Sequence, residues 1–430
     1  MHVDPSVVRL GLLGCGNVGA ALVSVLSEQG EVIEARTGLR LEVARVAVRN
    51  LAKPRPVQLP AGVMTHDADG VVHDPDIDLV VELVGGIEPA RSLVLDALKA
   101  GKPVVTANKE LVANVGTELF AAAEGAGVDL LFEAAVGGAI PIVRPLRESL
   151  AGSRIRRITG IVNGTTNYIL TRMSEEGATY ADALAEAQSL GYAERDPTAD
   201  VEGFDAGAKA AILATIAFGA SVVAGDVSHE GISAVTPADI AFGHRLGYEI
   251  KLLAVAEQGD DGRIAVRVHP AMVPTAHPLA SVRGSFNAVF IEGDVLGELM
   301  LYGRGAGGGP TASAVLGDVV VAAGNLRRGT CAGIGAMPRA VIRPVDEVRS
   351  AYYLHLEVLD RPGVLHAVAG VFAEHEVSIQ SMEQEGLGDE ARLIFITHEA
   401  AESAVQATLR SLRGLEAVDR VTNVVRVASG

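Results

Sequence analysis

Apolar residues recur along this chain in short unbroken runs that alternate with segments of helical periodicity. The first run covers residues 7–13 and is followed, after a glycine-rich turn, by apolar residues at helical spacing up to residue 26. Runs at residues 41–48, 76–84, 102–106 and 128–133 predict further strands, and residues 88–100 predict a helix between two of them. Short apolar strands that alternate with helices are typical of a parallel sheet covered on both faces.

The turn after the first run reads Gly-Cys-Gly-Asn-Val-Gly at residues 14–19. In such a turn the first glycine permits a sharp bend, the second admits a pyrophosphate to the backbone N–H groups, and the third lets helix and strand pack closely. The position of the pattern between a strand and a helix makes it stronger than the pattern alone, although a glycine turn without a ligand is the alternative. We therefore expect a Rossmann-type domain whose dinucleotide contacts Gly14, Gly16, Asn17, Val18 and Gly19.

Arg49 follows the second predicted strand, where many dinucleotide folds place an acid that binds the ribose diol. An arginine there favours a 2′-phosphate and therefore NADP over NAD. Lys53 and Arg55 could add positive charge to the same phosphate, although arginines at the start of a loop are commonly just solvated.

Residues 191–209 collect most of the candidate catalytic side chains. Asp205 and Lys209 lie four residues apart at the start of an apolar run, residues 206–223, which predicts a buried helix. Glu194, Asp196, Asp200 and Glu202 precede them. An ordinary surface ion pair is the alternative for a lone Asp–Lys pair, but the crowding of acids before a buried helix favours a functional site.

Lys109 follows the fourth predicted strand in the sequence Thr-Ala-Asn-Lys, residues 106–109. The carboxyl edge of a parallel sheet is where ligands bind, so Lys109 is expected near the reacting end of the cofactor. A solvated lysine at the start of a helix is the alternative.

A second domain begins after the irregular residues 134–141, which could also be a plain hinge. Residues 154–162 predict a strand, and Asn163 to Asn167 then open a helix with several hydrogen-bond donors. Residues 250–257, 264–269, 287–292 and 299–303 predict antiparallel strands of a mixed sheet, a surface often used for dimer contacts.

A second glycine-rich loop, residues 303–311, leads into an apolar helix at residues 312–323 and could return the chain to the nucleotide domain. A flexible linker is the alternative for this loop. Residues 324–349 show no periodicity and predict a linker. Residues 352–425 then spell strand, helix, strand, strand, helix, strand, which is a ferredoxin-like module.

Composition narrows the function classes. The 430 residues carry a net charge of −17 without any basic block, which argues against nucleic-acid binding. The two cysteines form no disulfide framework or metal-ligand spacing, and residues 210–225 are too short an apolar run for a membrane span. The first six residues lack the basic region of a signal peptide. We expect a cytoplasmic protein with a small-molecule partner.

Three motifs together resemble homoserine dehydrogenase: Gly-Ile-Val-Asn-Gly-Thr-Thr-Asn-Tyr-Ile-Leu at 160–170, Thr-Ala-Asn-Lys at 106–109, and Asp-Val-Glu-Gly-Phe-Asp-Ala-Gly-Ala-Lys at 200–209. Leu-Asp-Arg-Pro-Gly-Val-Leu at 359–365 resembles the first turn of an ACT domain, a module that senses amino acids. The arrangement is similar to the monofunctional form of the enzyme. It implies a nucleotide-binding domain at 1–135 completed by about 305–340, a catalytic and dimerisation domain at 136–304, and an ACT domain at 350–427.

The resemblance implies NAD(P)-dependent interconversion of L-homoserine and L-aspartate 4-semialdehyde, on the route to threonine, methionine and isoleucine. It implies Lys209 as proton donor and Lys109 as a second catalytic lysine, which also touches the cofactor beside Thr106, Gly191 and Gly307. The implied substrate-binding residues are Glu194, Asp205, Asp200, Thr166 and Tyr192. The implied sodium site comprises Glu133, Val136, Gly138 and Ile140, mostly through carbonyls.

The resemblance also leads us to expect L-threonine as an inhibitor bound by the ACT domain and a homodimer or homotetramer. Two alternatives stay open from the sequence, and a third is disfavoured. A regulator that senses NADP or an amino acid could use the same fold without turnover. An aldehyde-oxidising dehydrogenase would need an active cysteine, and neither Cys15 nor Cys331 is suitably placed. The tail could also be only a dimerising module.

Overall fold

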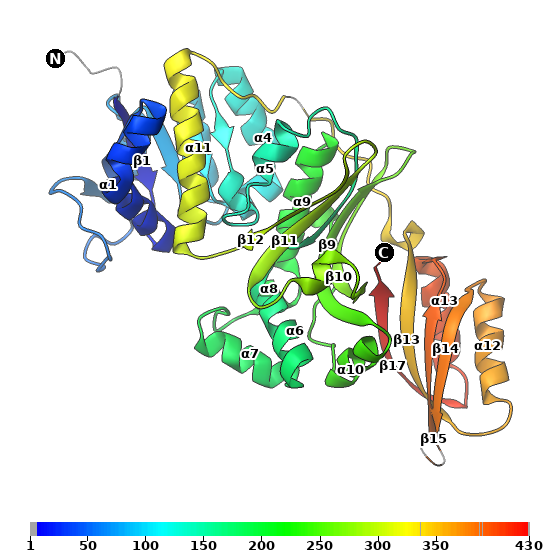
Figure 1. Cartoon of the computed structure of the whole chain (residues 1–430). Helices are drawn as coiled ribbons and strands as arrows, with labels where there is room; N and C mark the ends of the chain where they lie inside the picture. Colours follow the sequence, from blue (N-terminus) through cyan, green and yellow to red (C-terminus); the bar gives the residue numbers. More distant parts are fainter. Residues whose placement is uncertain (1–6, 336, 387, 389, 429–430) are drawn as a thin grey trace. The chain divides into compact units, whose positions relative to one another are not determined.

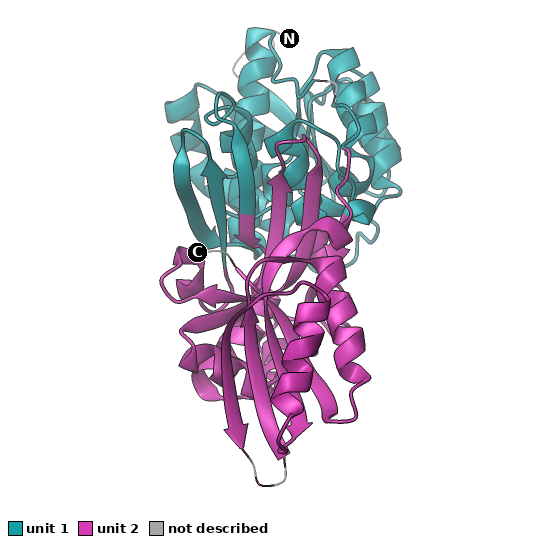
Figure 2. Cartoon of the chain, turned by 90° about the vertical axis from the view of Figure 1, so that its right-hand side faces the viewer, with its two compact units in different colours: residues 1–158, 208–226, 287–340 teal, residues 159–207, 227–286, 341–430 magenta. Residues whose placement is uncertain are grey.

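The computed structural model describes residues 7–335, 337–386, 388 and 390–428. The first six residues, on which the expectation of no signal peptide depends, lie outside that range. The chain forms two compact units (Figure 2), unit 1 with residues 1–158, 208–226 and 287–340, and unit 2 with residues 159–207, 227–286 and 341–430. The division falls within one strand, β7 (Ile155–Ile161), and within one helix, α9 (Phe204–Phe218).

Unit 1 is built on the expected parallel sheet. In the described part of the unit its strand order is β3-β2-β1-β4-β5-β6. The strands are β1 (Val7–Leu13), β2 (Arg40–Ala47), β3 (Met64–Thr65), β4 (Leu79–Glu82), β5 (Val104–Thr106) and β6 (Leu130–Leu131). Every described pairing among them is parallel. Leu79, Val80 and Val81 are all fully buried, so both faces of the sheet are covered.

The helices of unit 1 are α1 (Asn17–Thr37), α2 (Ala68–His73), α3 (Ala90–Lys99), α4 (Lys109–Ala126), α5 (Val143–Arg147) and α11 (Gly308–Arg328). Helices α1 and α11 pack side by side on one face of the sheet (Figure 1) and share a core with β1 and β4. Helix α11 is longer than predicted from the sequence, because the residues after the apolar run 312–323 continue the helix as an amphipathic surface turn. Residues 324–328, predicted as linker, therefore belong to the helix. Strands β11 (Phe286–Gly293) and β12 (Gly297–Arg304) precede α11.

Unit 2 contains the expected antiparallel strands. Strands β9 (Tyr248–Gln258) and β10 (Ile264–Pro274) pair antiparallel over their whole length. Its helices include α6 (Gly164–Glu176), α7 (Tyr180–Ser189), α8 (Thr198–Val201) and α10 (Pro237–Arg245). The sequence analysis did not predict α10, which is short but begins with a capping box between Thr236 and Asp239.

The C-terminal module of unit 2 has the expected ferredoxin-like order. Its elements are β13 (Arg349–Leu359), α12 (Val364–Glu374), β14 (Ile379–Gly386), β15 (Glu390–Thr397), α13 (Glu402–Arg413) and β17 (Val418–Val427), with a short β16 (Ala400–Ala401) besides. The strand order is β17-β13-β15-β14, all antiparallel, and the helices cover a separate apolar core.

The end of β17 also pairs with β10, since Ala271 lies opposite Arg426 and Met272 opposite Val427. The module is therefore hydrogen-bonded to the sheet of the same unit. Among the described helices, none is long and apolar enough to cross a membrane.

Candidate functional site

The first glycine loop has the geometry of a pyrophosphate cradle. Gly14 adopts φ 104°, and a Cβ on Gly19 would lie 2.7 Å from the carbonyl oxygen of Gly14, so both positions require glycine. Gly16 and Asn17 are exposed, and no side chain caps the start of α1. The N–H groups of this first turn therefore remain available to an anion.

The second glycine loop lies beside the first. Gly307 adopts φ 113° at the start of α11, again without a side-chain cap. A Cβ on Gly308 would lie 3.0 Å from the carbonyl oxygen of Asn17, so only glycine lets the two helix starts approach this closely. Two uncapped helix N-termini thus converge at the carboxyl edge of the sheet, which suits a dinucleotide phosphate.

The loop after β2 carries the candidate 2′-phosphate residues. Arg49 and Lys53 are both exposed. Arg55 Nε donates to the carbonyl oxygen of Cys15 at 3.2 Å, and its other nitrogens donate to the carbonyls of Asn50 and Lys53. Arg55 therefore fastens this loop to the glycine loop, while the charged ends of Arg49 and Lys53 stay on the surface.

Glu82 organises the region around Thr106 and Lys109. This fully buried carboxylate accepts hydrogen bonds from the Val84 and Gly85 N–H groups and from the Thr106 hydroxyl at 2.6 Å. Asn108 then caps α4, so the half-buried Lys109 is the first residue of that helix. The sequence analysis missed Glu82, although an acid at the end of an apolar strand is a visible signal.

The candidate cation residues form a tight irregular segment. The Glu133 carboxylate accepts three backbone hydrogen bonds, from Ile142, Val143 and Arg144 at 2.6–2.8 Å. With that carboxylate engaged, the ligands that remain for a cation are backbone carbonyls, whose directions are varied by the positive φ angles of Gly137 and Gly138. Among the described residues no group of three or more His, Cys, Asp or Glu could hold a metal ion.

Asp318 supports this segment from α11, and the sequence analysis missed it. Its Oδ2 accepts from the Glu133 N–H at 2.7 Å, and its Oδ1 pairs with Arg144 at 2.5 Å. Burial raises the pKa of the Asp318 carboxyl to about 6, against the lowering effect of those hydrogen bonds and of the Arg144 charge. Only the tertiary structure reveals this residue, because 185 positions separate it from Glu133.

The candidate substrate residues of unit 2 meet at one amide. Asn163, the residue that caps α6, donates from Nδ2 to Asp200 Oδ1 at 2.7 Å and to Asp205 Oδ2 at 2.8 Å. Asp205 is 6% exposed and lies in the first turn of α9, on which Lys209 follows one helical turn later and is half-buried. The structure therefore brings together the two carboxylates that the sequence singled out.

The other predicted substrate residues differ in exposure. Tyr192 and Glu194 are exposed in the segment after α7, as is Gly191, a predicted cofactor contact, and the Tyr192 ring packs on the Tyr168 ring at 4.9 Å between centroids. The Thr166 hydroxyl is instead buried and donates to Asn163. Thr166 thus supports the cap of α6, with its side chain engaged inside the unit.

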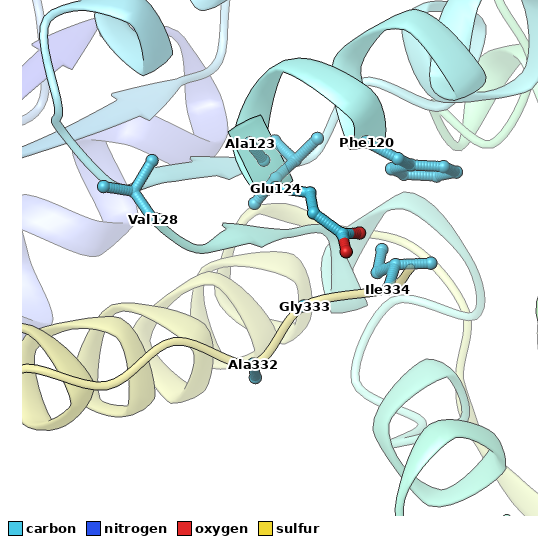
Figure 3. A pocket seen from close by; sticks show the side chains of 8 residues that line it. Phe120, Ala123, Glu124, Val128, Ala332, Gly333 and Ile334 are labelled. Carbon is cyan, nitrogen blue, oxygen red and sulfur yellow. The ribbon is translucent and has the colours of Figure 1, made fainter. Parts of the chain in front are cut away.

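Two cavities lie outside these residues. One, about 350 Å³, is lined by the turn from Leu359 to Leu365 together with Val358, Gln384 and Leu393 of the C-terminal module. The other is a void of about 10 Å³ between α4 and the chain after α11, lined by Phe120, Val128 and Ile334 among others (Figure 3). The second has room for about one water molecule and is a packing gap.

A dinucleotide cradle at the carboxyl edge of a parallel sheet is typical of a nicotinamide-dependent oxidoreductase. Family models agree: Homoserine dehydrogenase, NAD binding domain matches residues 14–133, Homoserine dehydrogenase matches residues 141–320, and ACT domain matches residues 352–417.

Individual relatives support the same assignment. Homoserine dehydrogenase of Corynebacterium glutamicum is 50% identical over 427 residues, which cover 98% of this chain and 96% of that protein. The crystal structure of a homoserine dehydrogenase from Thiobacillus denitrificans is 43% identical, with a TM-score of 0.93 and 98% of each chain covered. A hyperthermophilic archaeal homoserine dehydrogenase in complex with NADPH is 30% identical, with a TM-score of 0.61, and 74% of this chain and 97% of that chain are covered.

The chain belongs to the homoserine dehydrogenase family. It is an NAD(P)-dependent homoserine dehydrogenase with a C-terminal ACT domain, as the sequence motifs led us to expect.

Proposed function

We propose that Lys209 is the proton donor and acceptor of this enzyme, in the interconversion of L-aspartate 4-semialdehyde and L-homoserine. The observation that carries the proposal is the position of Lys209 on α9, one turn after the buried Asp205. Reduction of an aldehyde leaves an alkoxide, which needs a proton and a nearby positive charge as it forms. A lysine ammonium supplies both.

Lys109 is the second cation of the proposed mechanism. It lies at the carboxyl edge of the parallel sheet, directly after the Asn108 cap, where it polarises the aldehyde oxygen and touches the cofactor. The nicotinamide, when bound, supplies or accepts the hydride. Asp200, Asp205 and Glu194 provide negative charge for the ammonium or hydroxyl of the amino-acid substrate, with Tyr192 and Thr166 completing its surroundings and Gly191 and Gly307 beside the nicotinamide.

The test is nicotinamide absorbance with L-homoserine, with NADP and NAD in parallel, for wild type and Lys209→Ala. We expect wild-type turnover and a loss of about 10³-fold in kcat for the variant, within the range of a general acid–base group. Lys99→Ala is the matched control, because Lys99 is an exposed lysine whose partner is Asp96. A Lys209→Ala enzyme with near wild-type kcat would assign the proton transfer to another group.

NADP is the proposed preferred coenzyme, with NAD also accepted. Arg49 and Lys53 support this, since both present exposed positive charge beside the loop that Arg55 fastens to the glycine turn. The similar archaeal homoserine dehydrogenase in complex with NADPH supports it as well.

A monovalent cation, sodium in our proposal, binds the carbonyls of Glu133, Val136, Gly138 and Ile140. The three backbone hydrogen bonds to the Glu133 carboxylate agree with ligation mainly by carbonyls, which suits a hard cation. There the cation would stiffen the irregular segment. The test is activity in sodium against activity in a large organic cation at constant ionic strength, where loss without sodium is expected.

L-Threonine is the proposed inhibitor, bound at the turn of the ACT domain. The 350 Å³ cavity at that turn has ample room for an amino acid, and Asp360 lines it. Removal of the whole domain would expose the edge of β10, so a point substitution is the better test. Asp360→Ala should weaken inhibition by threonine at least tenfold, while the same substitution at Asp419, an exposed acid on β17, should not. Equal inhibition of both would place the effector elsewhere.

A homodimer or homotetramer in the cytoplasm completes the proposal, with the mixed sheet as the surface for the dimer contact. Size-exclusion chromatography with light scattering tests the oligomer.

A further inference from the structure

Asn163 has two different hydrogen-bonding ends, and both are occupied. Its Oδ1 accepts from the Thr166 N–H at 2.9 Å and from the Thr166 hydroxyl at 3.0 Å, which is the N-cap arrangement. Its Nδ2 donates to Asp200 and to Asp205. The side chain is 4% exposed, so water does not replace these partners.

The cap determines which way the amide points. A backbone N–H at Thr166 requires an acceptor, so the oxygen of Asn163 must face α6 and the NH₂ group must face the two carboxylates. Aspartate and serine cap helices as well as asparagine does, and threonine caps them only somewhat less well. None of them offers a rigid donor on the side opposite the cap, so helix capping alone does not account for asparagine here.

The two carboxylates reach Asn163 from a turn between helices. Asp200 is in α8 and Asp205 is in the first turn of α9, and Gly203 between them adopts φ 85°. Both carboxylates lie within hydrogen-bonding distance of the same amide nitrogen, so their like charges repel each other. A donor that both carboxylates share offsets part of that repulsion. Because the amide is neutral, it holds one oxygen of each carboxylate in place and adds no charge of its own to the cluster.

We infer that Asn163 is a positioning residue for the dehydrogenase reaction, which aligns the carboxylates of Asp200 and Asp205 for the ammonium or hydroxyl of the substrate. The inference rests on the proposed role of Asp205. It goes further, because it explains how β7 and the start of α6 set the geometry of residues about forty positions later in the chain.

The test uses two variants that keep the cap. Asn163→Ser removes the donor, and Asn163→Asp replaces it with a third acceptor of negative charge. We expect KM for L-homoserine to rise about tenfold in Asn163→Ser and kcat/KM to fall about a hundredfold in Asn163→Asp, with KM for the coenzyme unchanged in both. In Asn163→Asp the acid limb of the kcat/KM profile should move to higher pH, because a third carboxylate disfavours loss of the proton from the cluster.

Thr179→Ala is the control for capping alone, since Thr179 caps the exposed start of α7. It should lower Tm without changing either KM. If both Asn163 variants behaved like this control, with wild-type KM and pH profile, the positioning role would be overturned and Asn163 would be only a cap. Either variant that folds decides the point, and coenzyme binding reports folding.

Combination with Asp205→Asn separates this inference from the proposed function. If the inference is correct, Asn163→Ser and Asp205→Asn together should lose less than the product of their separate effects. Full activity of Asp205→Asn alone would remove the role of Asp205. An inactive Asp205→Asn enzyme beside a wild-type-like Asn163→Ser enzyme would overturn only the positioning by Asn163.

Discussion

Two buried side chains of unit 2, each of which bridges two carboxylates, differ in the charge of the bridge. At the start of α9 the bridge is the neutral amide of Asn163, between Asp200 and Asp205. At the end of β17 it is the guanidinium of Arg426, which donates to Glu402 at 2.6 Å and to Glu230 at 2.8 Å.

The acids of the Arg426 cluster are paired within the protein. Glu402 also accepts from the Tyr352 hydroxyl and from Gln406. Burial would raise the pKa of Glu402, but the Arg426 charge and these hydrogen bonds outweigh it, so the pKa lies below its usual value. Burial also raises the pKa of the Tyr352 hydroxyl well above its usual value. These charges join β17 to the rest of the unit.

The difference indicates what each cluster does. A cationic bridge offsets part of the charge of its acids and pairs them within the protein, which makes them part of the structure. An amide bridge orients its acids and adds no charge of its own, which suits acids that are proposed to bind a substrate. Substitutions at the two clusters should therefore separate activity from stability.

Asp205→Asn should have the largest effect. It removes a charge that the proposed mechanism uses, while asparagine keeps the shape. We expect kcat/KM for L-homoserine to fall about 10³-fold, within the range for a group that contacts the reacting substrate. Steady-state kinetics beside a thermal melt would check this. A large drop in Tm with retained kcat/KM would make the Asn163 cluster structural, like that of Arg426.

Glu402→Gln should have the opposite pattern. One partner of a buried pair is lost, so we expect the free energy of unfolding to fall by about 3 kcal/mol, with kcat nearly unchanged. Because the folded pKa of Glu402 is lowered, its contribution is present above the unfolded pKa and is lost as pH falls through the folded value. The difference in the free energy of unfolding between wild type and Glu402→Gln, measured with urea, should therefore become smaller in acid. A difference that is independent of pH would assign the effect to packing.

Lys251 differs from Arg426, because it is a buried charge whose hydrogen-bond partners are neutral. Its ammonium donates to the Val282 carbonyl at 2.7 Å, and burial lowers the pKa from 10.5 to about 8. The folded state thus loses this proton first as pH rises, so stability should increase between about pH 8 and 9.5 by about 2 kcal/mol. Lys251→Met should abolish that increase. The exposed Lys99→Met should preserve it, and an identical slope in both variants would contradict the assignment.

Arg49→Ala extends the comparison to the coenzyme, because the exposed guanidinium of Arg49 is proposed to bind the 2′-phosphate of NADP. We expect the ratio of kcat/KM for NADP to that for NAD to fall about tenfold, as for the loss of one charge-assisted contact. Arg36→Ala, at the exposed end of α1, is the control. A ratio that stays the same in Arg49→Ala would place the phosphate contact at other residues.

Much of the fold was predictable because its signals are local. Glycine at 14, 16 and 19 between a strand and a helix identified the nucleotide cradle, and the βαββαβ pattern identified the C-terminal module. Helix α10 was missed, because nine residues without a long apolar stripe carry little periodic signal. The motifs that resemble the family identified Lys109, Lys209 and Asp205 as candidate site residues.

The sequence by itself determined the parallel sheet, the ferredoxin-like module, the family and the acids that precede α9, since periodicity, glycine spacing and short motifs lie within a few neighbouring residues. Only the tertiary structure decided which polar groups contact one another: Asp318 accepts from the Glu133 segment, Arg426 pairs with Glu402 and Glu230, and Asn163 bridges Asp200 and Asp205. The physical reason is that a hydrogen bond depends on distances of about 3 Å in space. In each of these clusters the hydrogen-bonding partners are far apart in the sequence, so no local pattern predicts their contact.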